Sequence, residues 1–165
     1  MDAIEGHFLK YPSQGKVAEI MLRFGICAKD GWAYAGNVEI SDSALSKAAG
    51  VDRRVVRSAL KRMASEPELA NIFSKLRPIL LMDEVAPAIG CSAIEIIPTD
   101  ATMPGILADV ASVICEADLS IRQAVVDDVG EKGVPHLIVV VDGHVPPEVA
   151  ARVRRCRGVS GIIIR

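Results

Sequence analysis

Two stretches of the chain contain residues whose types and spacing suit the binding of a ligand. In the first, from Lys47 to Arg62, there are six basic side chains and one acid, Asp52, although the whole protein has a formal net charge of −2. Guanidinium and ammonium groups bind phosphates, and arginine also hydrogen-bonds to the edge of guanine. This local excess of positive charge indicates a polyanion as the partner of the segment.

The second stretch runs from Ile94 to Leu107 and reads as a short apolar strand, a polar loop and a helix that begins at Pro104-Gly105. Proline suits the first turn of a helix, and glycine lets another group approach the backbone closely. The first N–H groups of a helix have no intrahelical partner and lie at the positive end of its dipole. The pattern therefore predicts a site for a carboxylate at the start of this helix.

Groups for covalent or metal chemistry are scattered along the chain, without a nucleophile–base pair, a Gly-x-Ser-x-Gly elbow or a Cys-x-x-Cys pair. We expect reduced, mostly buried thiols, no metal, no cofactor and no enzymatic activity. The residues concerned are Cys27, Cys91, Cys115, Cys156, His7, His136 and His144.

The composition describes an aliphatic protein of 165 residues, with 50% hydrophobic, 24% charged and only 4% aromatic residues. The longest apolar runs, such as 137–141, are too short to span a bilayer, and the N-terminus lacks the pattern of a signal peptide. We therefore expect a cytoplasmic protein with no membrane partner. The aliphatic excess predicts that a second copy of the chain covers some apolar surface.

The basic stretch lies within two predicted short helices. Ser41 or Asp42 is expected to cap the first helix, Gly50 to form a tight turn, and Asp52 to cap the second helix. Two short helices joined through a glycine turn form the helix-turn-helix pattern. Before it, we expect a helix over 14–24 and a hairpin with Gly36-Asn37 as its turn.

The second helix should present its polar residues outward, since Val55, Val56, Ala59, Leu60 and Met63 form the opposite, apolar face. In a DNA-binding helix-turn-helix, the start of this helix enters the major groove. Three of the arginines are then expected to read guanine edges, and the last two basic residues to bind phosphates. The alternative is a solvated basic face. The candidate DNA-binding residues are Arg53, Arg54, Arg57, Ser58, Lys61 and Arg62.

This segment resembles winged helix-turn-helix regulators, and the resemblance implies duplex DNA as a partner. A strand over 78–82 is expected to complete the winged domain, and a connector follows it. We place the domain boundary near residue 84, so that residues 1–84 form the expected DNA-binding domain and residues 85–165 the second domain.

The second domain has a regular order of predicted elements: strands over 93–97, 121–127, 136–141 and 159–164, helices over 104–117 and 146–156, and a turn-rich connector over 128–133. This β-α-β-β-α-β order predicts a ferredoxin-like fold, so the whole chain belongs to the α+β class. Both helices must then cover one face of the sheet. Because the last two strands are apolar on both sides of the pleat, a homodimer is expected to bury the second face or to extend the sheet.

The strand, the loop and Pro104-Gly-Ile-Leu107 together resemble the opening of ACT domains, modules that bind amino acids and related metabolites for regulation. The resemblance implies a ligand whose carboxylate meets the N–H groups around Gly105 and Ile106, and whose ammonium group meets Asp100. A loop over 118–120 would come from the partner subunit, and several family members have Asn where this chain has Ser. The implied effector residues are Asp100, Met103, Pro104, Gly105, Ile106, Leu107 and Ser120. The alternative is an ACT-like fold kept only for dimerisation, with an empty site.

A second basic cluster lies on the last helix and consists of Arg152, Arg154, Arg155 and Arg157. A solvated face is the favoured interpretation, and additional phosphate contact is the alternative.

A helix-turn-helix followed by an ACT domain resembles the predicted archaeal regulators of amino-acid metabolism. The resemblance implies a dimeric transcription regulator that responds allosterically to an amino acid. A hypothesis from a different class is an amino-acid-sensing subunit that docks on a biosynthetic enzyme and does not bind DNA.

Overall fold

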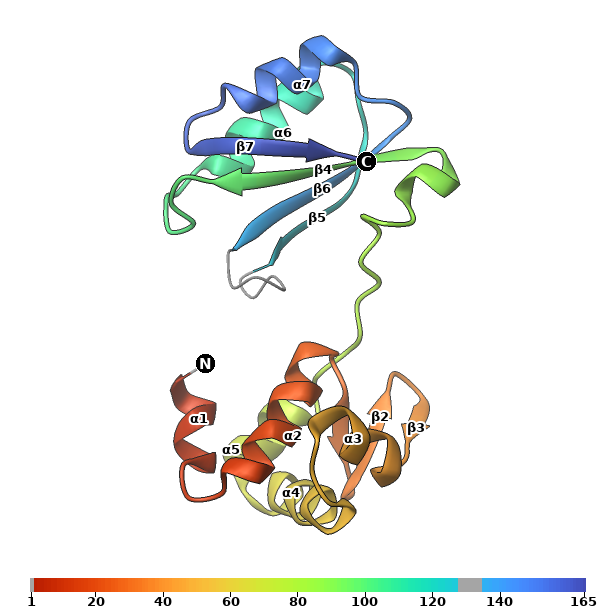
Figure 1. Cartoon of the computed structure of the whole chain (residues 1–165), viewed down its shortest axis with the longest axis vertical. Coiled ribbons are helices and arrows are strands. Elements are labelled where there is room, and N and C mark those ends of the chain that lie inside the picture. The colour runs from red at the N-terminus through yellow and green to blue at the C-terminus, as the bar shows by residue number, and fades with distance from the viewer. Residues whose placement is uncertain (1, 128–134) are drawn as a thin grey trace. The chain divides into compact units, whose positions relative to one another are not determined.

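The structure is a computed structural model that describes residues 2–127 and 135–165. The chain forms two compact units, Met1–Leu80 and Leu81–Arg165 (Figure 1). The sequence predicted the boundary between them near residue 84. A helix-turn-helix domain is followed by a ferredoxin-like domain, so the predicted α+β fold class is confirmed. Among the described residues, no helix combines the length and the apolar character needed to cross a bilayer.

The N-terminal unit packs helices around a small antiparallel sheet in the order β1-β2-β3. Its elements are α1 (Asp2–Phe8), α2 (Pro12–Arg23), β1 (Cys27–Lys29), β2 (Trp32–Ala35), β3 (Val38–Ile40), α3 (Asp42–Ala49), α4 (Arg53–Ser65) and α5 (Pro67–Phe73). The predicted hairpin is confirmed, since Ala35 pairs with Val38 across the Gly36-Asn37 turn.

The strand expected over 78–82 was a wrong prediction, because these residues form no strand. The sheet of this unit is completed by β1, which precedes the helix-turn-helix and pairs with β2. An apolar run predicts a strand only where another strand can pair with it. Here Ile79 and Leu80 remain 80% and 69% exposed.

Side-chain caps and a left-handed glycine define the helix-turn-helix as the sequence predicted. The Ser41 hydroxyl accepts a hydrogen bond from the N–H of Ala44 at 3.2 Å, and the Asp52 carboxylate accepts one from the N–H of Arg54 at 2.8 Å. Between them Gly50 has φ 63°, the left-handed conformation that glycine adopts at little cost. These caps satisfy N–H groups at the start of α3 and of α4.

The core of this unit lies where α2, α3, α4 and α5 meet. Val56, Ala59, Leu60 and Met63 of α4 are completely buried, so this face of the helix contributes apolar burial of roughly 1.5–3 kcal/mol for each large side chain. The opposite face of α4 is therefore the face available to a partner.

The C-terminal unit has a four-stranded antiparallel sheet in the order β5-β6-β4-β7. Its elements are a 3₁₀ helix η1 (Ala86–Ile89), β4 (Cys91–Pro98), α6 (Ile106–Glu116), β5 (Ile121–Asp127), β6 (His136–Asp142), α7 (Pro147–Arg154) and β7 (Val159–Ile164). The helix expected from Pro104 begins at Ile106, because Gly105 has φ +96° and serves as its N-cap. The connector expected over 128–133 lies outside the described residues.

The two faces of this sheet are covered differently. The helices α6 and α7 pack on one face, over a core that includes Ile94, Ile96 and Val139 (Figure 1). On the other face, Ala86 and Met82 pack against a smaller cluster that contains Ala93, Ile138 and Val140. Part of the face that the sequence assigned to a dimer is thus covered by the chain itself, and dimerisation remains a prediction.

Gly25 and Gly36 form a matched pair for a test of packing, since their φ angles are 62° and 63°. A Cβ on Gly25 would lie 2.2 Å from the carbonyl oxygen of Arg77, whereas a Cβ on Gly36 would meet nothing within 4 Å. We expect Gly36→Ala to destabilise the protein by about 1 kcal/mol through its conformation alone. Gly25→Ala should cost about 1–3 kcal/mol more, because the backbone of residues 77–78 must move.

Urea unfolding of the full-length chain, followed by circular dichroism, measures this difference. If the two variants lose the same free energy of unfolding, the backbone of residues 77–78 moves away from the added methyl group at no cost, and the prediction is wrong.

Candidate functional site

The outward face of α4 contains all six predicted DNA-binding residues, and the structure divides them into two groups. Arg53, Arg54, Ser58 and Lys61 are exposed, whereas Arg57 and Arg62 are half-buried on opposite flanks. Within the part of the chain that the structure describes, the side chains of Arg53, Arg54 and Lys61 form no hydrogen bond or ion pair. Their positive charge is therefore available to a partner.

Arg57 contacts three other elements. Its Nη1 donates a hydrogen bond to the carbonyl of Gly31 at 3.0 Å, and its Nη2 lies 2.6 Å from the carboxylate of Asp42. The guanidinium carbon lies 4.2 Å from the centre of the Trp32 ring, in the geometry of a cation–π interaction. Arg57 thus positions α4 against α3 and the β1–β2 turn, and it would have to release Asp42 to contact a base.

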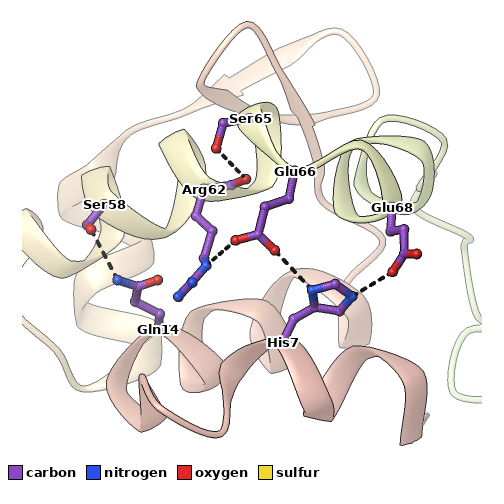
Figure 2. A network of polar contacts seen from close by, with 7 residues as sticks. All are labelled: His7, Gln14, Ser58, Arg62, Ser65, Glu66 and Glu68. Carbon is purple, nitrogen blue, oxygen red and sulfur yellow. Dashed lines mark hydrogen bonds and ion pairs between the residues drawn. The ribbon is translucent and has the colours of Figure 1, made fainter.

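Arg62 belongs to a network that fastens the other flank of α4 to the N-terminal helices (Figure 2). Its Nε donates a hydrogen bond to Glu66 at 2.6 Å, and its guanidinium carbon lies 3.9 Å from the centre of the Tyr11 ring. The second carboxylate oxygen of Glu66 lies 2.9 Å from Nδ1 of His7, whose Nε2 lies 3.0 Å from Glu68. The hydrogen bond from Arg62 holds the pKa of the Glu66 carboxyl below its usual value.

A depression of about 350 Å³ lies between the start of α2 and the first half of α4, next to Arg54. Gln14 donates a hydrogen bond to Ser58 at 3.1 Å in its wall (Figure 2). Among the described residues, the carbonyl oxygen of this Gln14 side chain is buried and has no hydrogen-bond partner. Sequence reasoning missed Gln14, because only the packing of α2 on α4 brings it to the basic face.

The carboxylate of Asp100, which the resemblance assigned to the ammonium group of a ligand, forms hydrogen bonds within its own turn. It accepts hydrogen bonds from the N–H of Thr102 at 2.9 Å and from the Thr102 hydroxyl at 2.7 Å. These bonds lower the pKa of the Asp100 carboxyl. The side chain closes its own turn and does not line the neighbouring cavity.

A cavity of about 150 Å³ gathers four of the predicted effector residues, Met103, Gly105, Ile106 and Leu107. Pro104 is exposed outside its lining. The remaining lining comes from the other strands and loops at this end of the sheet: Pro98, Ala101, Val126, Pro135, His136 and Leu137. The sequence could not indicate His136 as a neighbour of Gly105, since the strand order of the sheet determines that proximity.

Ser120 lies at the opposite end of the same sheet. Its carbonyl oxygen accepts a hydrogen bond from the N–H of Asp142 at 2.9 Å, and Asp142 pairs with Cys91 at the beginning of β4. The cavity, in contrast, lies beyond the end of β4 at Pro98. Within one copy of the chain, Ser120 therefore lies far from the loop between β4 and α6.

Among the described residues, no three His, Cys, Asp or Glu side chains are placed to hold a metal ion together. The thiols Cys27, Cys91, Cys115 and Cys156 are all free. Burial raises the pKa of the Cys156 thiol, which keeps that sulfur in its less reactive protonated form.

No protein-family model matches the chain, and no curated protein matches it in sequence. Among solved structures, a homoserine dehydrogenase from Thiobacillus denitrificans is 19% identical, with a TM-score of 0.35 over 73% of this chain, which spans only 28% of that protein. PH0061 is 12% identical over 92% of this chain and 88% of its own, with a TM-score of 0.29. An AsnC family transcriptional regulator from Agrobacterium tumefaciens is 13% identical over 93% of this chain and 86% of its own, with a TM-score of 0.30. Likenesses at this level do not establish a family.

Removal of the Arg57 side chain should destabilise the N-terminal unit, because it breaks the ion pair with Asp42 and the contact with Trp32. We expect Arg57→Ala to cost about 1–2 kcal/mol, the sum of a partly exposed ion pair and a cation–π contact. Arg57→Lys should restore only part of this, since an ammonium group lacks the planar fork. Urea unfolding measures the loss, with Lys61→Ala as a control expected to stay within about 0.5 kcal/mol of wild type. Equal effects of Arg57→Ala and Lys61→Ala would contradict the positioning role.

The lowered pKa of Glu66 gives a pH-dependent prediction. A carboxyl whose pKa is lower in the folded chain stabilises the fold above its unfolded-state pKa, and this contribution disappears as the pH falls through the folded-state pKa. The wild-type protein should therefore have a higher melting temperature than the Glu66→Gln variant at neutral pH, and the two melting temperatures should become equal in acid. Glu19→Gln, at an exposed position on α2, is the control. A difference that stays constant with pH would argue against the charge of Glu66 as its cause.

Proposed function

We propose that the protein is an amino-acid-responsive transcription regulator, which binds duplex DNA through α4 and a small metabolite at the start of α6. The observation that carries the proposal is the set of three outward cations on the second helix of a capped helix-turn-helix. Arg53, Arg54 and Lys61 are exposed there, and within the described residues their side chains have no partner. Unpaired cations on a helix that fits the major groove suit a polyanion.

The positions along α4 suggest different roles for these cations. Arg53 and Arg54 lie in its first turn, the part of a recognition helix that contacts base edges. Lys61 lies two turns later and suits a phosphate oxygen. Ser58 and the neighbouring Gln14 add polar groups next to Arg54. Arg57 and Arg62 contribute by holding α4 at this orientation.

Regulation by a ligand would act through a dimer. Half-sites read by a two-fold symmetric helix-turn-helix dimer lie about 34–36 Å apart on DNA, so a change in the spacing of two α4 helices alters affinity. A ligand that binds one spacing more tightly than another shifts the equilibrium toward it. A second copy would also have to supply Ser120, the polar residue that the resemblance implies, because within one chain Ser120 lies at the opposite end of the sheet.

A regulatory subunit that docks on an enzyme is the second candidate. Large apolar side chains on the N-terminal unit favour it, since Leu9, Phe24 and Val38 are 79%, 56% and 66% exposed. Salt distinguishes the two functions, because phosphate neutralisation gives a steep dependence on salt and apolar contact does not.

DNA binding is tested by fluorescence anisotropy with a labelled mixed-sequence duplex, between about 50 and 200 mM salt. Lys61→Ala should weaken binding uniformly and lower the salt slope by about 1, and Arg54→Ala should cost about 1–3 kcal/mol on a preferred sequence. Arg23→Ala is the control, since Arg23 lies at the other end of α2 from Gln14. A wild-type chain without affinity for duplex DNA at low salt would exclude the regulator and leave the docking subunit.

A further inference from the structure

Three arginines that the sequence assigned to a solvated face lie together where α7 leads into β7 (Figure 1). Arg154 is the last residue of α7, Arg155 is its C-cap, and Arg157 lies two residues further on. All three side chains are exposed, and within the described part of the chain they form no hydrogen bond, ion pair or ring contact. We call these three residues the α7 arginine cluster.

The unit that contains the cluster is otherwise acidic. Residues 81–165 include twelve acidic and seven basic residues, and four of the seven basic residues lie between 152 and 157. The fourth of these, Arg152, is neutralised by an ion pair with Glu116 of α6. Positive charge without a counter-charge is therefore concentrated at one place on a negative unit, a pattern that indicates an anionic partner.

The acidic side chains near the cluster do not neutralise it. The carboxylate of Asp100 accepts its two hydrogen bonds from Thr102. Burial, and after it the charge of Asp109, raises the pKa of the Cys156 thiol, so Asp109 lies near this segment. Among the described residues, however, Asp109 forms no ion pair. The cluster keeps its positive charge.

The backbone that carries the cluster is fixed at both ends. The N–H of Arg155 donates a hydrogen bond to the carbonyl of Arg152 at 3.0 Å, and the N–H of Thr99 donates one to the carbonyl of Gly158 at 2.8 Å. A Cβ on Gly158 would lie 2.8 Å from the sulfur of Met103, so the segment packs closely on its neighbours. Cations on a fixed backbone lose less conformational freedom on binding than cations on a mobile tail.

Stabilisation of the helix end explains only part of the cluster. A cation in the last turn of a helix interacts favourably with the helix dipole, and this accounts for Arg154 and Arg155. The effect falls off within the last turn, and Arg157 lies beyond it.

The dimensions and chemistry of the cluster suit the phosphates of a nucleic acid. Four consecutive residues span at most about 11 Å, since neighbouring Cα atoms are about 3.8 Å apart. One strand of a duplex carries a phosphate about every 3.4 Å along its axis, so about three phosphates fit this length. The planar fork of arginine also matches two phosphate oxygens at once.

A lipid surface suits the cluster less well. Proteins that bind a membrane surface commonly combine cations with aromatic side chains that enter the headgroup region. Residues 81–165 contain no tryptophan, tyrosine or phenylalanine.

We propose that the α7 arginine cluster is a second phosphate-binding surface, through which the C-terminal unit contacts the backbone of duplex DNA. The proposal rests on the proposed function, in which α4 binds the same duplex. Because one chain carries both surfaces, a duplex held by α4 is at a high local concentration for the cluster. Phosphate contacts carry no sequence information, so the cluster adds affinity and salt dependence without changing which sequence is preferred.

Fluorescence anisotropy with the full-length chain tests the contact. The probe is a labelled mixed-sequence duplex of about 30 base pairs, roughly three helical turns, and the salt concentration runs from about 50 to 200 mM. The triple variant Arg154→Gln, Arg155→Gln, Arg157→Gln should lower the slope of log affinity against log salt by about 2 to 3, since each phosphate contact contributes about 0.9. A triple variant with the wild-type slope overturns the proposal.

A matched pair of single variants separates direct contact from net charge. Arg155→Gln and Arg152→Gln remove the same charge from positions three residues apart, but Arg152 is already paired with Glu116. We expect Arg155→Gln to lower the salt slope by about 0.9 and Arg152→Gln to leave it unchanged. Equal effects of the two variants would mean that net charge alone acts, and would overturn the contact. Unchanged circular dichroism spectra establish that the variants are folded.

Two further outcomes distinguish the partner and the proposed function. If wild type cosediments with vesicles of phosphatidylserine and phosphatidylcholine, and the triple variant loses only this binding, the cluster serves a lipid surface and the proposal is wrong. If Arg54→Ala and Lys61→Ala weaken DNA binding while the triple variant binds like wild type, the second surface alone is overturned. A wild-type chain that does not bind duplex DNA at low salt overturns the regulator together with it.

Discussion

The contacts of the Arg57 guanidinium are the interaction on which the orientation of α4 in the N-terminal unit depends. This guanidinium joins the carboxylate of Asp42 at the start of α3, the carbonyl of Gly31 and the ring of Trp32. A solvated ion pair would contribute little, but a planar cation shared by three elements fixes the direction of a short helix. Arg62 does the same on the other flank through Glu66 and Tyr11. Arg53, Arg54 and Lys61, on the outward face of α4, have no side-chain partner among the described residues.

The elements of the helix-turn-helix were predictable because their signals are local. Ser41, Gly50 and Asp52 act within three residues of themselves, so their caps and their turn can be read from the chain alone. The roles of the arginines were not predictable in the same way. Periodicity places Arg54 and Arg57 on one stripe. Only the packing of β2 and α3 shows that Arg57 is bound to Asp42, whereas the side chain of Arg54 has no partner among the described residues.

The C-terminal unit shows the same limit. Strand and helix order followed from alternation and periodicity, and the ferredoxin-like topology followed from that order. The strand expected over 78–82 failed because apolar character does not supply a pairing partner. Of the residues predicted to bind an effector, Asp100 bonds to Thr102 two residues away, whereas Met103, Gly105, Ile106 and Leu107 line one cavity with residues of other strands. Sequence patterns identify the loop, and the fold identifies its neighbours.

The distribution of aromatic residues, Trp32 among them, makes one half of the molecule optically distinct. The chain has one tryptophan, two tyrosines and three phenylalanines, and all six lie before residue 81. Ultraviolet emission therefore comes entirely from the N-terminal unit, and the ferredoxin-like domain contributes none. A metabolite that binds near α6 can alter the emission of Trp32 only if its effect passes from one unit to the other. The intrinsic fluorescence of the unmodified protein is thus a direct gauge of communication between its two halves.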